Sequence, residues 1–241
     1  MESPVTGASL ARVAGRRRIA LLGRIEVTSY LVLLYAGCVL GVLAGAAVAA
    51  SEGLDPARFA LAATLLLVPA FAGARLLFVL QHLALFRVEP ARAWRRAEGG
   101  SSLYGGLLLA VAVSVPALAL ANLPFWSFWD AASVTMLVGL VPTRFGCVMN
   151  GCCGGHAKSG PLAYPQLLEA AWAGIVLAGA LALRGAARPG EVFAGVVAAY
   201  AAGRLVLEPT RHPSGRSRVN VIVSIALLVA GFALLLAGGP G

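Results

Sequence analysis

The chain has 241 residues, of which 59% are hydrophobic and 12% are charged. Soluble domains average roughly 45–50% apolar and about 25% charged residues, so an ordinary soluble enzyme is excluded. A run of about 20 apolar residues can cross a bilayer, and this composition leaves room for several such runs joined by short loops. We therefore expect an all-α, polytopic membrane protein.

The formal net charge of +9 comes almost entirely from arginine, since Lys158 is the only lysine. In a soluble protein this excess would suggest nucleic acid, but the basic residues lie on loops beside apolar segments and lack interleaved aromatic side chains. The bilayer surface or an anionic substrate is the better interpretation, and no nucleic-acid partner is expected. Guanidinium groups favour phosphate because their planar fork of donors matches phosphate oxygens.

The chain is predicted to consist of a basic tail, residues 1–24, and a single transmembrane domain, residues 25–238. The first apolar run ends in AAVAAS, which resembles a signal-peptidase site, yet it is longer than the roughly 7–15 apolar residues of a cleaved signal. We therefore expect an uncleaved first helix. Seven transmembrane helices are predicted, at about residues 27–50, 59–86, 103–120, 131–149, 166–183, 192–207 and 219–237.

The fourth span is predicted to be interrupted near its end by Pro142 and Arg144, before the glycine-rich stretch NGCCGGHAKSGP. A broken helix would expose unpaired backbone N–H groups beside the guanidinium group. Both would suit a phosphate.

The loops carry their basic residues unequally. With loops assigned to alternate sides of the membrane, 13 basic residues share one side with the N-terminal tail and three lie on the other. The positive-inside rule then predicts a cytoplasmic N-terminus.

Several ionisable residues fall within or beside the predicted spans, where their usual explanation is function or pairing inside the bundle. Four arginines exceed three carboxylates in this set, so an anionic ligand would balance the charge. The set consists of Arg75, Asp130, Arg144, Glu169, Arg204, Glu208 and Arg211, accompanied by His82, Tyr30, Tyr104 and Tyr200.

The spacing of Arg204, Glu208 and Arg211 places them on one helix face, provided that the helix continues past Pro209. Two interpretations stay open for Glu208. It either belongs to a binding site or simply closes a salt-bridged helix end at the interface.

Three cysteines and a histidine form the pattern C-x4-C-C-x2-H around one turn. Adjacent cysteines rarely bind one ion with good geometry, so no metal site is predicted, and we favour small packing residues over redox chemistry. The pattern consists of Cys147, Cys152, Cys153 and His156.

Six segments in order resemble the prolipoprotein diacylglyceryl transferases of bacteria, from about Ile25 to Ile225. TSYLVLLYAG is similar to the family's SYG segment, GARLLFVL to GARLGYVL, and EGGSSLYGGLL to EGG-x-x-x-HGG-L. TRFGCVMNGCCGG is similar to GR-x-GNF-x-NGE-x-x-G, PQLLEA to PQLYEA, and RLVLEPTR to R-x-x-x-E-x-x-R. The chain departs from these motifs at Tyr104 (usually histidine), Thr143 (glycine), Cys147 (asparagine) and Cys152 (glutamate).

The resemblance implies transfer of a diacylglyceryl group from phosphatidylglycerol to the lipobox cysteine thiol of a lipoprotein precursor, in the bacterial cytoplasmic (inner) membrane and without a cofactor. Arg144 and Arg211 would hold the phosphate and act in catalysis together with Tyr104. A phenol with an ordinary pKa near 10 is a poor base, so Tyr104 is expected to position groups, and the base stays unidentified. Substrate binding is assigned to Tyr30, Arg75, Gly105, Gly106, Asp130, Asn150, Gly151, Gly155, Arg204 and Glu208, with Asp130 orienting Arg144.

The resemblance also implies an N-terminus outside the cytoplasm, opposite to the orientation that the loop charges predict. Two other functions stay open. One is a phospholipid-binding membrane protein that has lost the chemistry, and the other is a transporter or channel for small anions, which a broken fourth helix would permit.

Overall fold

The computed structural model describes residues 18–21, 25–88, 102–151, 164–211 and 217–237. The described part opens with a short antiparallel hairpin of β1 (Arg18–Leu21) and β2 (Ile25–Thr28). This hairpin was not predicted. Most of the predicted tail and residue 155 lie outside the described residues, as do Cys152, Cys153 and His156.

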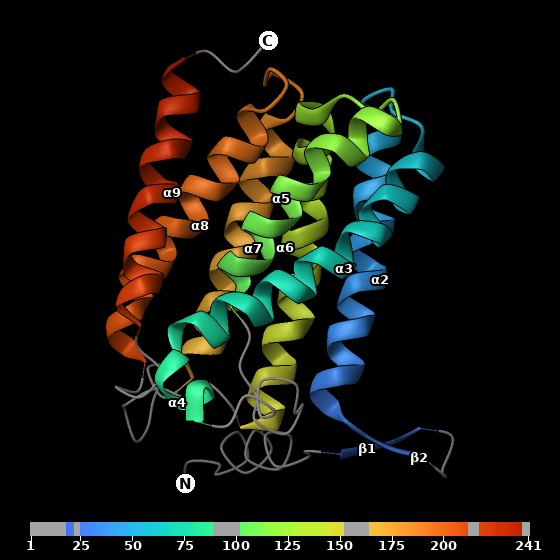
Figure 1. Cartoon of the computed structure of the whole chain (residues 1–241). Helices are drawn as coiled ribbons and strands as arrows, with labels where there is room; N and C mark the ends of the chain where they lie inside the picture. The colour runs from blue at the N-terminus through green and yellow to red at the C-terminus, as the bar shows by residue number, and fades with distance from the viewer. Residues whose placement is uncertain (1–17, 22–24, 89–101, 152–163, 212–216, 238–241) are drawn as a thin grey trace, which may run out of the picture.

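Most of the rest of the described structure is helical (Figure 1). Seven of these helices are long and apolar enough to cross a membrane, which confirms the all-α polytopic fold with seven spans. The spanning helices are α2 (Ser29–Ser51), α3 (Pro56–Gln81), α5 (Leu103–Leu120), α6 (Phe125–Asn150), α7 (Pro165–Leu183), α8 (Glu191–Leu207) and α9 (Arg218–Leu236). Two short helices, α4 (Leu83–Val88) and the 3-10 helix η4 (Glu208–Thr210), accompany them.

The helix α6 runs without a break from Phe125 to Asn150, so the predicted interruption at Pro142 is wrong. Proline removes one backbone hydrogen bond but is tolerated in membrane helices where neighbouring groups compensate. Thr143 donates from Oγ1 to the Gly139 carbonyl at 2.8 Å, and the Pro142 ring faces Gly37 of α2. The continuous helix removes the feature that had allowed a transporter.

Glycines allow two pairs of helices to approach closely. A β carbon on Gly41 of α2 would lie 2.4 Å from the Thr135 carbonyl oxygen of α6. Between α3 and α5, a β carbon on Gly73 would lie 2.3 Å from the Gly105 oxygen, and the reverse distance is the same. Small residues at such contacts are typical of helix packing in membranes, where backbones meet directly.

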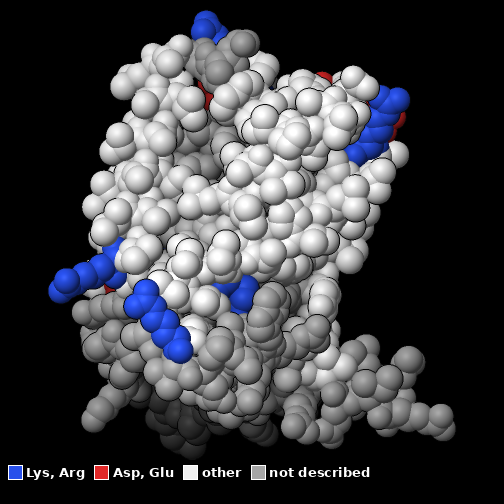
Figure 2. Space-filling model, in the orientation of Figure 1, with Lys and Arg blue, Asp and Glu red and all other residues white. Residues whose placement is uncertain are grey.

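Large apolar side chains point outward along the bundle, as expected for a surface that contacts lipid. Val68 of α3 is 70% exposed and Val229 of α9 is 62% exposed. Figure 2 shows a band without lysine, arginine, aspartate or glutamate across the middle of this face, with charged side chains above and below it.

The two ends of the bundle are distinguished by helix direction. At the lower end in Figure 1, α2, α5, α7 and α9 begin and α3, α6 and α8 finish. The opposite end of the bundle is called the upper end. Since the number of spans is odd, α2 begins and α9 ends on opposite sides of the membrane.

Candidate functional site

Five charged residues converge at the lower end of the bundle, and we call them the arginine cluster. They come from four elements and the segment that follows one of them: Arg144 (α6), Glu169 (α7), Arg204 (α8), Glu208 (η4) and Arg211, directly after η4. Chain geometry explains their meeting. Arg144 lies near the end of a descending helix, Glu169 lies in the second turn of the ascending helix that starts at Pro165, and Arg204 lies in the last turn of α8.

Glu169 is the centre of the cluster. Its Oε1 accepts from Arg204 Nη1 at 2.6 Å and also from Arg211 Nη2, while its Oε2 lies 2.9 Å from Arg144 Nε. The Glu169 side chain is 1% exposed. A carboxylate buried to this degree is stable only when its charge is offset, and here three guanidinium groups offset it.

Glu208 supplies the second carboxylate and joins Arg204 and Arg211, although the helix continuation past Pro209 on which the predicted shared face depended does not occur. Its Oε2 accepts from Arg204 Nη2 at 3.0 Å and lies 4.0 Å from Arg211 Nε. Its Oε1 accepts from the backbone N–H of Ser217 at 3.2 Å, which ties the cluster to the start of α9. The α8 helix ends at Leu207, two residues before Pro209, and the 3-10 helix η4 follows it directly.

The arginine cluster has three guanidinium groups and two carboxylates, so it carries one net positive charge in buried surroundings. Electrostatic attraction is stronger there than in water because screening is weak. Guanidinium groups cannot lose their protons at neutral pH and offer several donors each. The arrangement therefore suits a singly charged phosphodiester.

Tyr104 of α5 is connected to the cluster through two routes. Its hydroxyl lies 2.6 Å from Ser224 Oγ of α9, and the Arg204 guanidinium lies close enough to interact with it. Its ring packs edge-on against Tyr200 at 6.4 Å, and the Tyr200 hydroxyl accepts from Arg144 Nη2 at 3.3 Å. The sequence places Tyr200 within a predicted span together with the ionisable residues, but it predicts no role for this tyrosine.

The direction of the Tyr104 hydrogen bond follows from its partner. Ser224 donates its hydroxyl proton to the Asn220 carbonyl at 2.7 Å, so the Tyr104 hydroxyl is the donor to Ser224. Tyr104 thus stands as a protonated group that positions its neighbours.

Further polar contacts tie α9 to α3 beside the cluster. Gln81, at the end of α3, donates from its side-chain Nε2 to Asn220 Oδ1 at 3.1 Å. The side-chain oxygen of Gln81, Oε1, accepts from Ser217 Oγ at 3.4 Å. Because Ser217 also donates its backbone N–H to Glu208, the start of α9 is fixed to both α3 and η4.

Two other predicted residues lie on neighbouring helices. Tyr30 is in the first turn of α2, and its backbone packs on the end of α6, where a β carbon on Gly146 would lie 3.2 Å from the Tyr30 Cα. Arg75 of α3 stacks its guanidinium group over the rings of Phe78 and Phe86, at 5.4 and 5.9 Å. Their binding of substrate stays a prediction.

Gly105 and Gly106 face α3. A β carbon on Gly106 would lie 2.8 Å from the Ala70 carbonyl oxygen, and Gly105 meets Gly73 even more closely. The α3 and α5 backbones are in contact here, and Ser102 also donates its N–H to the Ala74 carbonyl at 2.9 Å. Helix packing explains both glycines, and a role toward substrate stays a prediction.

Asp130 does not orient Arg144, and this prediction is wrong. The two residues share α6 but are 14 positions apart, which is about 21 Å along a helix. At the upper end, the Asp130 carboxylate accepts from the backbone N–H groups of Gly190 at 2.6 Å and Phe193 at 2.8 Å. It therefore caps the start of α8. Glu169 takes the place that had been expected for Asp130.

The end of α6 is made by Asn150 and Gly151. Gly151 has a φ of 69°, a left-handed conformation that favours glycine, and its N–H bonds back to the last turn. Cys147 is buried in that turn. Gly155, predicted to shape the same loop, lies outside the described residues.

Glu169 was missed as a site residue, although a signal was present. It is a carboxylate within an apolar span, and PQLLEA was one of the matched segments. Spacing along one helix cannot show that α7 brings this carboxylate against arginines of two other helices.

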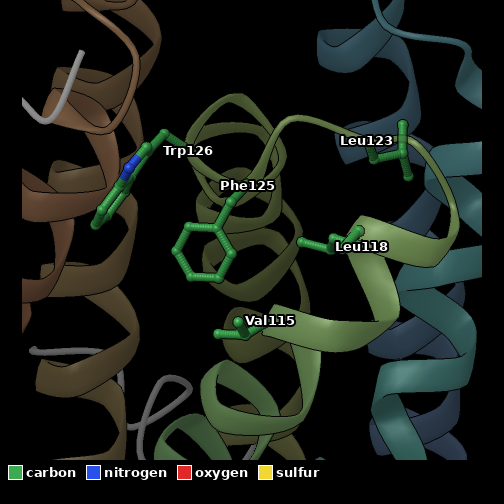
Figure 3. A pocket seen from close by; sticks show the side chains of 6 residues that line it. Val115, Leu118, Leu123, Phe125 and Trp126 are labelled. Carbon is green, nitrogen blue, oxygen red and sulfur yellow. The ribbon is translucent and has the colours of Figure 1, made fainter.

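Two cavities lie away from the arginine cluster. One, of about 340 Å³, lies between the end of α5 and the start of α6 at the upper end, and Figure 3 shows its apolar lining. It is lined by Val115, Leu118, Ala119, Leu123, Phe125 and Trp126. The other, of about 370 Å³, lies along α3 and α5 with Arg58 at its rim. The first lacks charged side chains, so it does not suit a phosphate.

Comparisons with known proteins agree with the resemblance. The family model for prolipoprotein diacylglyceryl transferase matches residues 17–237. A phosphatidylglycerol–prolipoprotein diacylglyceryl transferase of Symbiobacterium thermophilum is 27% identical, with 89% of each chain covered. One of Nitrobacter winogradskyi is 30% identical over 90% of this chain and 86% of its own, and one of Bacillus velezensis is 26% identical over 89% of each.

Proposed function

The chain belongs to the prolipoprotein diacylglyceryl transferase family, and we propose that it uses the arginine cluster to bind the phosphate of phosphatidylglycerol. It is a transferase that moves a diacylglyceryl group to a prolipoprotein. The observation that carries the assignment of the site is the meeting of Arg144, Arg204 and Arg211 on one buried carboxylate at one end of a membrane bundle.

The reaction forms one bond and breaks one. The sulfur of the lipobox cysteine, as thiolate, attacks the glycerol carbon of the diacylglyceryl group and forms a thioether C–S bond. The bond between that carbon and the phosphate oxygen breaks, and its electron pair stays on the oxygen. Glycerol phosphate leaves, and the thiol proton passes to a base. Stabilisation of the leaving phosphate is therefore the main demand on the protein.

Arg144 and Arg211 are the groups that meet this demand. Each guanidinium group carries five N–H donors, and the two reach Glu169 from different elements, so together they can contact the phosphate from two sides. Arg204 is held between Glu169 and Glu208, and its two ion pairs fix the positions of these carboxylates. Donors that are in place before the reaction need no reorganisation as charge develops on the leaving oxygen.

The substrates also define the location. Phosphatidylglycerol and a lipobox-containing precursor reach the lower end of the bundle from the bilayer, and the protein acts as a multi-pass protein of the bacterial cytoplasmic (inner) membrane. The displacement needs no redox cofactor, since thiolate attack on carbon transfers no electrons between redox centres.

A transfer assay tests the proposal. Purified protein in phosphatidylglycerol vesicles is incubated with a lipobox peptide, and the mass added to the peptide cysteine is measured. Arg144→Ala and Arg211→Ala are each expected to lower kcat at least 100-fold, while Arg184→Ala at the upper end, bound to Ser51 at 3.0 Å, retains activity. Near-normal turnover in both cluster variants would contradict the assignment.

A further inference from the structure

Glu169 has an unusual position among the charges of the cluster. One carboxylate contacts guanidinium groups from α6, α8 and the segment after η4, and it is almost fully buried. Without it, Glu208 would be the one carboxylate of the cluster left to offset three guanidinium groups in a region with little solvent. Glu169 therefore both holds the three arginines in place and sets how much positive charge a ligand meets.

The net charge matters because substrate and product differ in charge. A lipid phosphodiester carries one negative charge, which the single positive charge of the cluster neutralises. Glycerol phosphate is a monoester with a second pKa of about 6, so it carries about −1.5 to −2 at pH 7. With the product bound, the cluster and its ligand together therefore carry excess negative charge. With the substrate bound, the two charges cancel.

We propose that Glu169 is a positioning residue whose charge also favours release of the phosphate monoester product from the arginine cluster. This inference rests on the proposed function. With a neutral side chain at position 169, the cluster would carry two positive charges and match the doubly charged product. Glu169 thus speeds turnover and lowers the affinity of the cluster for the anionic product.

The test compares Glu169→Gln, which keeps the shape and removes the charge, with Glu52→Gln, an exposed carboxylate at the upper end, as a matched control. The Kd of glycerol phosphate is measured by calorimetry, and kcat is measured in the transfer assay. Glu169→Gln is expected to lower the Kd at least tenfold, because a nearby negative charge is removed, and to lower kcat about tenfold as release becomes slow. Glu52→Gln is expected to change neither.

An unchanged or raised Kd in folded Glu169→Gln would overturn the proposal, because a purely structural ion pair would weaken anion binding when broken. If Glu169→Gln does not fold, Glu169→Asp decides. It keeps the charge but shortens the reach, so the Kd is expected to stay within twofold of wild type while kcat falls about tenfold. Wild-type kcat in this variant, or a Kd shifted beyond twofold, would contradict the dual role.

The binding measurement also separates this inference from the proposed function. Wild-type protein that binds glycerol phosphate but adds no mass to the peptide would contradict the transferase assignment. The Kd comparison between wild type and Glu169→Gln would still test the charge role of Glu169.

Discussion

Arg144 and Glu169 face each other across the α6–α7 interface, with Nε 2.9 Å from Oε2. This pair joins two helices that adjoin in sequence through a glycine-rich segment, and it brings the arginine motif against the carboxylate of PQLLEA. Breaking a buried pair by removing one partner typically costs about 3–5 kcal/mol. The pair therefore fixes the position of Arg144 for the chemistry as well as stabilising the bundle.

Tyr104 is expected to position α9 by donating its hydroxyl proton to Ser224. Tyr104→Phe removes the hydroxyl and is expected to lower kcat about tenfold in the transfer assay, with a shift of the melting temperature below about 2 °C. Tyr35→Phe, on a side chain that is 60% exposed on α2, is the matched control and is expected to retain full activity. Full activity of Tyr104→Phe would show that the hydroxyl has no role.

Asp130 is expected to contribute to stability and not to chemistry. Asp130→Ala leaves the backbone N–H groups of Gly190 and Phe193 without their acceptor, a loss of about 1–3 kcal/mol in the free energy of unfolding. Asp55→Ala is the matched control, since Asp55 caps α3 at an exposed site with one bond to Arg58 N at 2.8 Å, and about 1 kcal/mol is expected there. Thermal unfolding measures both. Loss of transfer by folded Asp130→Ala at unchanged stability would contradict this prediction.

The contact of Gly73 with Gly105 is expected to tolerate no side chain. Gly105→Ala places a methyl group against the α3 backbone, which must shift, and we expect the melting temperature to fall by several degrees. Gly179→Ala meets nothing within 4 Å and is expected to be neutral or stabilising, because alanine favours helix over glycine by about 1 kcal/mol. A wild-type melting temperature for Gly105→Ala would contradict the packing role.

Two arguments predict opposite membrane orientations, and a pair of C-terminal fusions decides between them. Membership of the family implies that the end of α9 lies in the cytoplasm and that the arginine cluster faces outward. The loop charges imply the reverse. We expect a C-terminal green fluorescent protein to fluoresce and a C-terminal alkaline phosphatase to be inactive. The opposite pair of results would favour the positive-inside rule over the family.

Hydropathy was enough to predict the seven spans, because lipid imposes long apolar helices regardless of packing detail. The spacing of Arg204, Glu208 and Arg211 likewise indicated that they lie together, and their ion pairs form although α8 ends at Leu207. Both predictions depend on rules that act within one segment.

Predictions that crossed between helices were less successful. The interruption at Pro142 was inferred from proline chemistry alone, whereas Gly37 on a distant segment provides the space for the ring. Asp130 was paired with Arg144 by charge, although helix direction puts the two at opposite ends of α6. Glu169 was left out for the same reason, because its partners are set by the packing of α7 against α6 and α8.

Complementation in a bacterium depleted of its own transferase tests the central claim most directly. The wild-type gene is expected to restore the thioether-linked diacylglyceryl group on a reporter lipoprotein, measured by mass spectrometry of its N-terminal peptide. Arg144→Ala is expected to restore none at equal protein level, and Tyr35→Phe is expected to match the wild type. Wild-type protein that accumulates in the membrane without any modified reporter would contradict the account and favour a phospholipid-binding protein that has lost the chemistry.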